Sequence, residues 1–206
     1  YLTEYTGEGY YVRFVRMCIN TLAGVPSIVF GLFGMAFFVI VVLPRLGLHE
    51  GSSILAGSLT LAVLVLPIMI RASEEALRAV PRSYREASLA LGAGGLRTFL
   101  SVTLPAALPG ILTGIILSMS RAAGETAPIL FTAAVAYRLG IPNSIFEGGT
   151  RALSYGAYDI AVGDRIGAEV PHNQYGMICT LILLVLILNI AAIVIRSRMS
   201  AKLRGS

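Results

Sequence analysis

The most constraining feature of this sequence is a set of four long apolar runs. The first covers Ala23–Leu43, the second Ser53–Ile70, the third extends from about Leu108 to about Tyr137, and the fourth covers Met177–Ile195. At about 1.5 Å per helical residue, each run can cross a hydrocarbon core of about 30 Å. Only helices and closed barrels satisfy the backbone inside lipid, and the sequence lacks the polar alternation of barrel strands. It therefore predicts an all-α integral membrane protein.

The composition excludes several other classes of protein. Charged residues make up 13% of the chain, about half of their usual share in soluble domains. A disordered chain, a disulfide-rich secreted domain and an ordinary cytosolic enzyme are all inconsistent with this composition. The sequence starts at Tyr1 without a signal-peptide pattern, so we expect it to be part of a longer protein.

The distribution of basic residues predicts an orientation in the membrane. Fifteen of the 16 basic residues are Arg, and the net charge is +5. Eleven basic residues lie before the first run, between the second and third, or after the fourth, and four lie in the other connections. The positive-inside rule then places both ends and residues 72–107 in the cytoplasm, and residues 138–176 outside. Because this bias is typical of membrane proteins, we expect no nucleic-acid partner.

Two opposite charges interrupt the third run. Arg121 and Glu125 lie four residues apart, so on a helix they point the same way and can form a pair. A charge at the centre of a bilayer costs at least about 2.5–3.5 kcal/mol, which some interaction must offset. One interpretation is a structural ion pair. The other is a polar passage in which the planar guanidinium attracts an oxyanion. Gly124 and Pro128 favour a broken helix beside the pair, of the kind that lines cavities.

Other residues in the spans carry weaker signals. Arg71 ends the second run, where position alone indicates an arginine that reaches toward the interface. Small residues recur every four positions in the third run and predict close packing against another helix. These residues are Gly110, Gly114, Ser118 and Ala122.

The connection at residues 72–107 contains three stretches of helix-forming residues, each followed by a helix breaker. The stretches are Glu74–Val80 before Pro81, Tyr84–Leu91 before Gly92, and Leu96–Leu104 before Pro105. In the second stretch, Tyr84, Ala87 and Leu91 share one apolar face, which needs a protein partner or the membrane surface.

The same connection carries the motif that is most specific to one family. Glu86-Ala87-Ser88 is followed after three residues by Gly92 and, nine residues later, by Val102-Thr103-Leu104-Pro105. This resembles the EAA-x3-G-x9-I-x-L-P signature of ABC importer permeases, with Ser for the second Ala and Val for Ile. The spacing of the signature is fully kept.

A second resemblance narrows the family. The run from Arg121 to Ala133 is similar to one in the permeases of phosphate importers, as is the run from Val25 to Gly34. The resemblance implies a MetI-like transmembrane domain in the bacterial plasma (inner) membrane. That fold has six membrane helices per subunit, so we expect two to be missing here and residues 1–10 to end the second. Residues 1–206 are then a single permease domain, with 72–107 its cytoplasmic coupling loop and 138–176 its external loop.

The resemblance also implies site residues and partners. Substrate-pathway roles fall on Arg71, Arg121 and Glu125. The short helix that docks on the ATPase in this family maps to Glu86, Ala87, Ser88, Leu91, Gly92 and Ala93. The implied partners are a homologous second permease, two ATPase subunits that hold ATP and Mg²⁺, an external phosphate-binding protein, and the lipid bilayer.

The sequence gives no sign of chemistry in this chain itself. It has no phosphate-binding G-x-x-x-x-G-K-[ST] run, and neither its two cysteines nor its two histidines have metal-ligand spacing. We therefore expect no catalytic residue, metal or cofactor in the chain. Three alternatives stay open: a permease of the same fold for sulfate or molybdate, an ion-coupled transporter or channel that uses Arg121 and Glu125, and a membrane scaffold in which they are only a buried pair.

Overall fold

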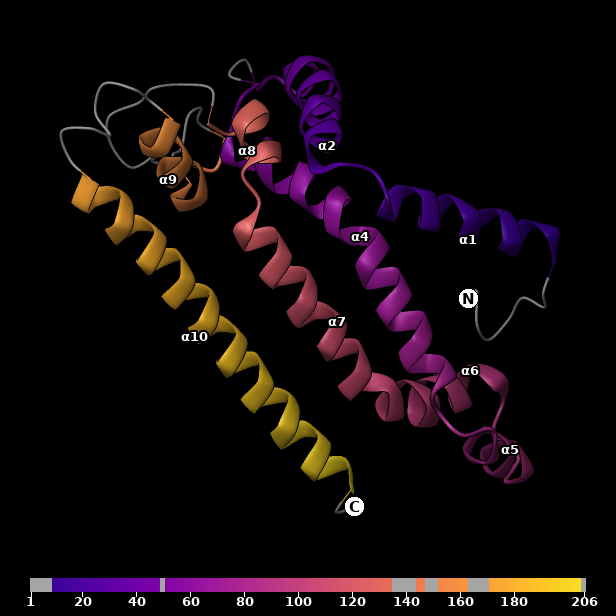
Figure 1. The fold of residues 1–206 in the computed structure, drawn as a ribbon. Helices are drawn as coiled ribbons and strands as arrows, with labels where there is room; N and C mark the ends of the chain where they lie inside the picture. Colours follow the sequence, from indigo (N-terminus) through magenta and orange to yellow (C-terminus); the bar gives the residue numbers. More distant parts are fainter. Residues whose placement is uncertain (1–8, 49–50, 135–143, 147–151, 163–170, 205–206) are drawn as a thin grey trace. The chain divides into compact units, whose positions relative to one another are not determined.

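The computed structural model of this chain describes residues 9–48, 51–134, 144–146, 152–162 and 171–204. Within these ranges every regular element is a helix (Figure 1). The all-α prediction is therefore confirmed for the described part. The chain divides into two compact units. The first comprises Tyr1–Ala23, Leu66–Met119 and Leu188–Ser206, and the second comprises Gly24–Val65 and Ser120–Ile187.

The elements include α-helices and two π-helical stretches, labelled η. In chain order they are α1 Tyr10–Ala23, α2 Ser27–Gly34, η1 Met35–Val42, α3 Leu43–Arg45, α4 Ile54–Arg78, α5 Arg82–Ala90, α6 Gly95–Thr98, η2 Phe99–Thr103, α7 Leu104–Gly124, α8 Ala127–Thr132, α9 Leu153–Val162 and α10 Pro171–Arg204.

Four helical segments in the described residues are long and apolar enough to span a membrane. They are Ser27–Arg45 with 19 residues, Ile54–Arg78 with 25, Gly95–Gly124 with 30, and Tyr175–Arg198 with 24. This confirms that there are four spans, but the third ends at Gly124 and not near Tyr137, because the helix breaks before Pro128. The orientation of the ends stays a prediction. Residues 138–176, predicted to be external, lie largely outside the described ranges; α9 and the start of α10 are their described helical parts.

At two prolines the observed helix limits differ from the predicted ones. The first span begins at Ser27, because Pro26 adopts an extended conformation (φ −59°, ψ 142°) and precedes the helix. The expected helix end at Pro105 is wrong, since one continuous helical segment runs from Gly95 to Gly124. Proline lacks an N–H group and crowds the preceding turn. The π-helical stretch η2 lies directly before Leu104-Pro105, where its wider turn accommodates the ring.

In the first unit, α4 and α7 pack through small residues. A Cβ added to Gly110 would lie 2.6 Å from the Cβ of Ala76, and one added to Gly114 would lie 2.5 Å from the Cβ of Ala72. Both pairs repeat at a spacing of four residues, so the two backbones approach closely along one seam. This confirms the close packing predicted for Gly110 and Gly114. The same unit also joins α10 to α7, because Arg196 donates a hydrogen bond to Thr113 Oγ1 at 2.8 Å.

In the second unit, the short helix α8 is the centre of the packing. Ile129 and Ala133 form a buried cluster with Ala134 and Tyr155. On another side of α8, Gly31 of α2 is so close that an added Cβ would lie 2.8 Å from the carbonyl oxygen of Ala127. These contacts fix α8, and with it the end of α7 that precedes it in the chain.

Candidate functional site

The helix break predicted near Arg121 and Glu125 is present. The helix α7 ends at Gly124, and α8 begins at Ala127 with Pro128 in its first turn. Proline at position 128 cannot donate a hydrogen bond and would crowd the carbonyl of Gly124, so one continuous helix is unfavourable here. In the first turn of a new helix its missing N–H group costs nothing, because that group has no intrahelical partner anyway.

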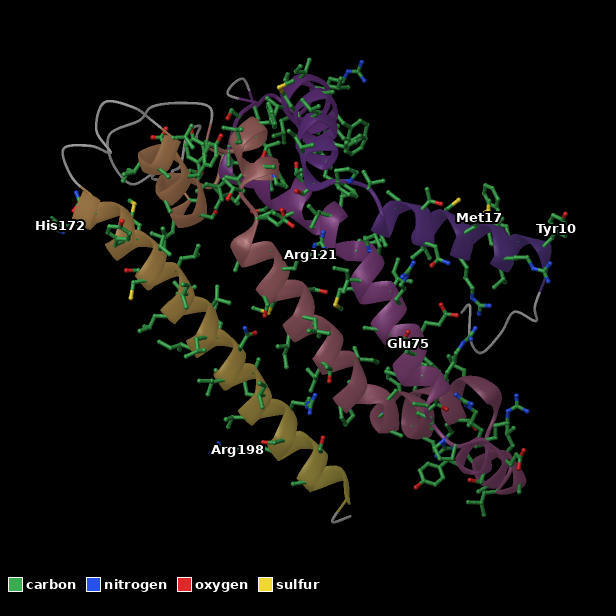
Figure 2. The ribbon with its side chains drawn as sticks, in the orientation of Figure 1. Tyr10, Met17, Glu75, Arg121, His172 and Arg198 are labelled. Atoms are coloured by element: carbon green, nitrogen blue, oxygen red, sulfur yellow. The ribbon has the colours of Figure 1, made fainter. Side chains whose placement is uncertain are left out.

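Arg121 and Glu125, here called the pathway pair after their predicted role, lie on the two sides of this end of α7. The distance from Arg121 Nε to Glu125 Oε1 is 3.5 Å, and the exposed fractions of the two side chains are 46% and 17%. Figure 2 shows Arg121 on α7. The separation allows an ion pair, but the side chain of Arg121 makes no hydrogen bond to any described residue. A guanidinium has five N–H donors, so most of them remain available to an anion.

The backbone at the break is held by a hydrogen bond from another helix. Ser154 Oγ of α9 donates to the carbonyl oxygen of Glu125 at 3.1 Å. This carbonyl has lost its helical partner, because α7 ends at the preceding residue. Ser154 is itself buried, at 7% exposure. The contact therefore replaces a helical hydrogen bond and fixes the backbone that carries the pathway pair.

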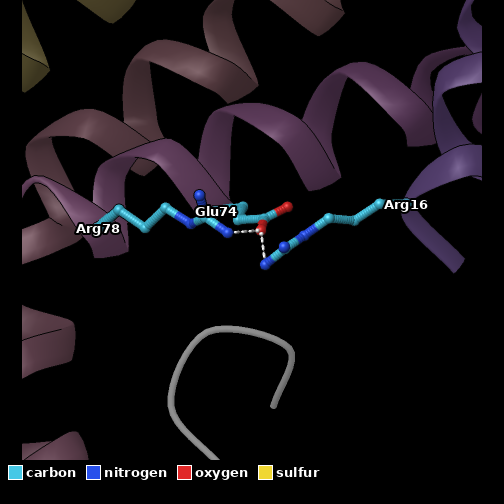
Figure 3. Close-up of polar contacts among 3 residues, drawn as sticks. All are labelled: Arg16, Glu74 and Arg78. Carbon is cyan, nitrogen blue, oxygen red and sulfur yellow. Dashed lines mark hydrogen bonds and ion pairs between the residues drawn. The ribbon is translucent and has the colours of Figure 1, made fainter. Parts of the chain in front are cut away.

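Arg71, the third residue expected on the pathway, belongs to the first unit, whereas Arg121 and Glu125 belong to the second. Arg71 lies on α4 and donates a hydrogen bond to Asn20 Oδ1 of α1 at 2.5 Å. One turn further along α4, Glu74 Oε1 accepts from Arg16 Nη2 at 2.6 Å and from Arg78 Nη2 at 2.9 Å (Figure 3). The structure thus surrounds Arg71 with charged residues from two helices.

The helix α1, which supplies Arg16 and Asn20 to this group, was not predicted from the sequence. The signal was present, because Val12, Val15 and Ile19 follow an i, i+3, i+7 spacing. Val12 and Ile19 are buried, at 1% and 9% exposure. The opposite side of α1 exposes aromatic and sulfur side chains, including Tyr10 at its start and Met17 in its middle (Figure 2).

The predicted coupling residues form a short helix with a defined end. The helix α5 covers Arg82–Ala90, and Gly92 after it has a φ of +83°, a conformation that favours glycine. The N–H of Gly92 donates to Leu89 at 2.9 Å and that of Ala93 to Ser88 at 3.2 Å. This is the hydrogen-bond pattern of a Schellman cap. It explains why a glycine stands at this position of the signature.

The apolar face predicted on α5 is exposed. The exposed fraction is 54% for Tyr84 and 89% for Leu91, and Glu86 and Ala87 are exposed as well. Two side-chain hydrogen bonds help to hold the helix: Arg85 donates to the carbonyl of Leu77 at 2.9 Å, and the hydroxyls of Ser88 and Thr98 lie 2.9 Å apart. Arg85 and Ser88 therefore join α5 to neighbouring segments of the first unit, and the apolar face of α5 stays exposed in the described structure. A docking element would have these two properties.

Comparison with protein families gives one match over almost the whole chain. The family described as "binding-protein-dependent transport system inner membrane component" matches residues 8–205. Among solved structures, the chain resembles an inward-facing MetNI methionine ABC transporter, with a TM-score of 0.64 and 21% identity, over 92% of this chain and 76% of that one. At this identity the likeness shows the fold alone, and it confirms the predicted MetI-like fold.

Several relatives are more similar in sequence. The phosphate transport system permease protein PstA 1 of Mycobacterium tuberculosis H37Rv is 38% identical over 196 residues, which is 95% of this chain and 60% of that protein. The PstA of Yersinia pestis is 45% identical over 132 residues, covering 64% and 42% of the two chains. The probable ABC transporter permease YqgI of Bacillus subtilis is 42% identical over 133 residues, covering 65% and 43%. The chain therefore spans about half the length of these relatives.

Proposed function

The chain belongs to the family of inner-membrane components of binding-protein-dependent transport systems, and from this premise we propose that it forms the membrane pathway of an ATP-driven importer of inorganic phosphate. The observation that carries the proposal is the pathway pair. A guanidinium that makes no hydrogen bond to the described residues lies inside an apolar span, next to a break in the helix. The names of the PstA relatives, which describe phosphate transport permeases, support phosphate as the anion.

The pathway pair supplies both attraction and release in this proposal. The guanidinium of Arg121 is planar and offers paired N–H groups that match the oxygens of a tetrahedral anion. Glu125, 3.5 Å away, partly neutralises Arg121 and repels the anion. A transport site must bind well enough for entry and weakly enough for exit. A lone arginine in low dielectric would hold phosphate too tightly, so the carboxylate makes passage possible.

The energy for transport comes from other subunits in this proposal. The partners would be a PstC-like second permease, two PstB-like ATPase subunits with ATP and Mg²⁺, and an external PstS-like phosphate-binding protein. Both described ends would be cytoplasmic. The exposed face of α5, with Leu91, would dock on an ATPase subunit, and the Schellman cap at Gly92 would keep its shape.

The docking role of α5 can be tested at its cap. Proline at position 92 cannot adopt a φ of +83° and cannot donate the hydrogen bond to Leu89. We expect Gly92→Pro to abolish co-purification of the ATPase subunits while the chain still inserts into the membrane. Gly94→Ala is the matched control, because an added Cβ there meets no atom within 4 Å. Normal co-purification with Gly92→Pro would exclude this docking surface.

The proposal itself is tested by phosphate uptake. Vesicles holding the complete transporter would be supplied with ATP and binding protein, and uptake of radiolabelled phosphate measured for wild type, Arg121→Ala and Arg121→Lys. Loss of charge-assisted hydrogen bonds worth about 1.5–3 kcal/mol predicts a fall of about 10- to 150-fold for Arg121→Ala. Arg121→Lys should retain part of the uptake. Uptake of sulfate or molybdate but not phosphate by wild type would overturn the choice of anion.

A further inference from the structure

A pocket in the first unit has no part in the function proposed above. It lies between α1 and the last two turns of α4, has a volume of about 280 Å³, and is open to the surroundings. Six side chains line it, here called the cationic cluster: Arg16, Asn20, Arg71, Glu74, Glu75 and Arg78. We infer that this pocket binds an oxyanion, and, resting on the proposed function, that the anion is phosphate on its way out of the transporter.

The charge in the pocket is unevenly paired. Three guanidinium groups face two carboxylates, and Glu74 already contacts both Arg16 and Arg78 through one oxygen (Figure 3). Arg71 donates to the neutral amide oxygen of Asn20, and the described residues give it no carboxylate partner. Among the residues that the structure describes, one positive charge at the pocket therefore lacks a bonded counter-ion. A mobile anion can supply it.

Donor groups without acceptors point to the same ligand. Arg16 Nε is buried and has no hydrogen-bond partner among the described residues. Asn20 accepts from Arg71 through its oxygen, which leaves the two N–H groups of its amide for another acceptor. Buried donors are normally satisfied, and an unsatisfied one needs an explanation. Because both donors belong to residues of one pocket, a ligand with several acceptor oxygens and negative charge fits them.

The two carboxylates fit a site that releases its ligand. Glu74 holds two guanidinium groups in place, so the donors are arranged before an anion arrives. Glu75 also lines the pocket and lowers its net positive charge (Figure 2). Binding is thus weak, which suits a ligand that must leave. The basic bias of the sequence assigns this end of α4 to the cytoplasm, so the pocket serves as an exit site.

The competing explanation is an ion network that only fastens α1 to α4. The two explanations predict opposite results for Asn20→Asp. A carboxylate at position 20 would form an ion pair with Arg71, so a fastening network would be as stable or more stable. An anion site would lose two donors and its unpaired positive charge. Thr21→Asp is the matched control, since it adds the same charge one residue later on an exposed position outside the pocket.

The experiment is equilibrium binding of radiolabelled inorganic phosphate to the complete transporter in lipid nanodiscs, without the external binding protein. Arg121→Ala is the background, so that the pathway pair does not contribute. We expect Asn20→Asp to weaken binding at least tenfold with an unchanged or raised melting temperature, and Thr21→Asp to bind like the background. Equal binding by Asn20→Asp and the background would overturn the inference, as would equal losses in both aspartate variants.

A second variant covers the case in which Asn20→Asp does not assemble. Arg16→Lys keeps the positive charge but removes the buried Nε–H group, so we expect about fivefold weaker phosphate binding with the complex intact. Unchanged binding would overturn the site. The uptake measurement separates the two proposals. A wild-type transporter that takes up no phosphate contradicts the proposed function. Normal uptake by wild type, together with an unaltered phosphate binding constant for Asn20→Asp, contradicts only the exit site.

Discussion

The two arginine sites of this chain are built in different ways. The pathway pair, Arg121 and Glu125, comes from one helix end, and its partners lie four residues apart in sequence. The cationic cluster joins two helices, and the hydrogen bond from Arg71 to Asn20 connects residues 51 positions apart. The first site therefore depends on where α7 breaks, and the second depends on how α1 packs on α4. Local chain geometry creates one site and tertiary packing creates the other.

The largest expected effect comes from exchanging the charges of the pathway pair. Arg121→Glu/Glu125→Arg keeps an i,i+4 ion pair, and its order, with the acid nearer the helix start, is the more favourable one. A purely structural pair would tolerate the exchange. We expect assembly to be unchanged and phosphate uptake to fall at least about tenfold, because the guanidinium no longer lies at position 121. Normal uptake would reduce the pair to a structural role.

The next effect tests whether the cationic cluster depends on packing. Leucine at position 114 would collide with Ala72, because even a Cβ there would lie 2.5 Å from the Cβ of Ala72. We expect Gly114→Leu to destabilise the first unit by about 1–3 kcal/mol and to weaken phosphate binding at the cluster. The melting temperature of the purified complex measures the first effect. Gly124→Ala, where an added Cβ meets nothing within 4 Å, should change it little.

A smaller effect of mixed sign is expected at the centre of the cluster. Glu74→Gln removes the charge that contacts Arg16 at 2.6 Å and Arg78 at 2.9 Å. The partly buried guanidinium of Arg16 would lose its counter-ion, so we expect stability to fall by about 1–2 kcal/mol, below the 3–5 kcal/mol of a fully buried pair. Phosphate binding should become several-fold tighter, since the pocket becomes more positive while the amide oxygen of Gln still accepts hydrogen bonds that keep the guanidinium groups in place. Thermal unfolding and the phosphate titration, read together, would show both changes. Weaker binding would argue against an anion site.

The smallest expected effect is at the break itself. Ser154→Ala removes the hydrogen bond to the Glu125 carbonyl, which costs about 0.5–1.5 kcal/mol. We expect a modest fall in melting temperature and a less than threefold change in uptake. Cys at this position would restore only a weak donor and serves as the isosteric comparison. A loss of uptake as large as that of Arg121→Ala would show that backbone position at the break, rather than charge, controls transport.

The parts of the fold that local sequence patterns determine could be predicted from the sequence. The four spans, the break before Pro128 and the end of α5 at Gly92 all follow from apolar run length, proline chemistry and a glycine stop. Reasoning from residues also placed Arg121 and Glu125 together, because helical spacing alone brings them close.

The same reasoning missed features that depend on contacts distant in sequence. The helix α1 was not predicted, because its apolar stripe is short and is followed by a much stronger apolar run. Without α1, nothing indicated that Arg16 and Asn20 would meet Arg71 and Glu74. The passage of the helix through Pro105 was also missed, since a π-helical turn leaves no residue pattern that distinguishes it from an α-helical one.

That π-helical turn gives the permease signature a geometric meaning. An i→i+5 turn encloses one residue more than an α-helical turn, whereas one extra residue in a plain α-helix would rotate all that follows by about 100°. The nine residues between Gly92 and Val102 include the start of η2. The number of these residues therefore sets the rotation of α7 about its axis as well as the distance of α7 from Gly92. It determines which side of α7 carries Gly110 and Gly114 toward α4 when the chain leaves the cap of α5.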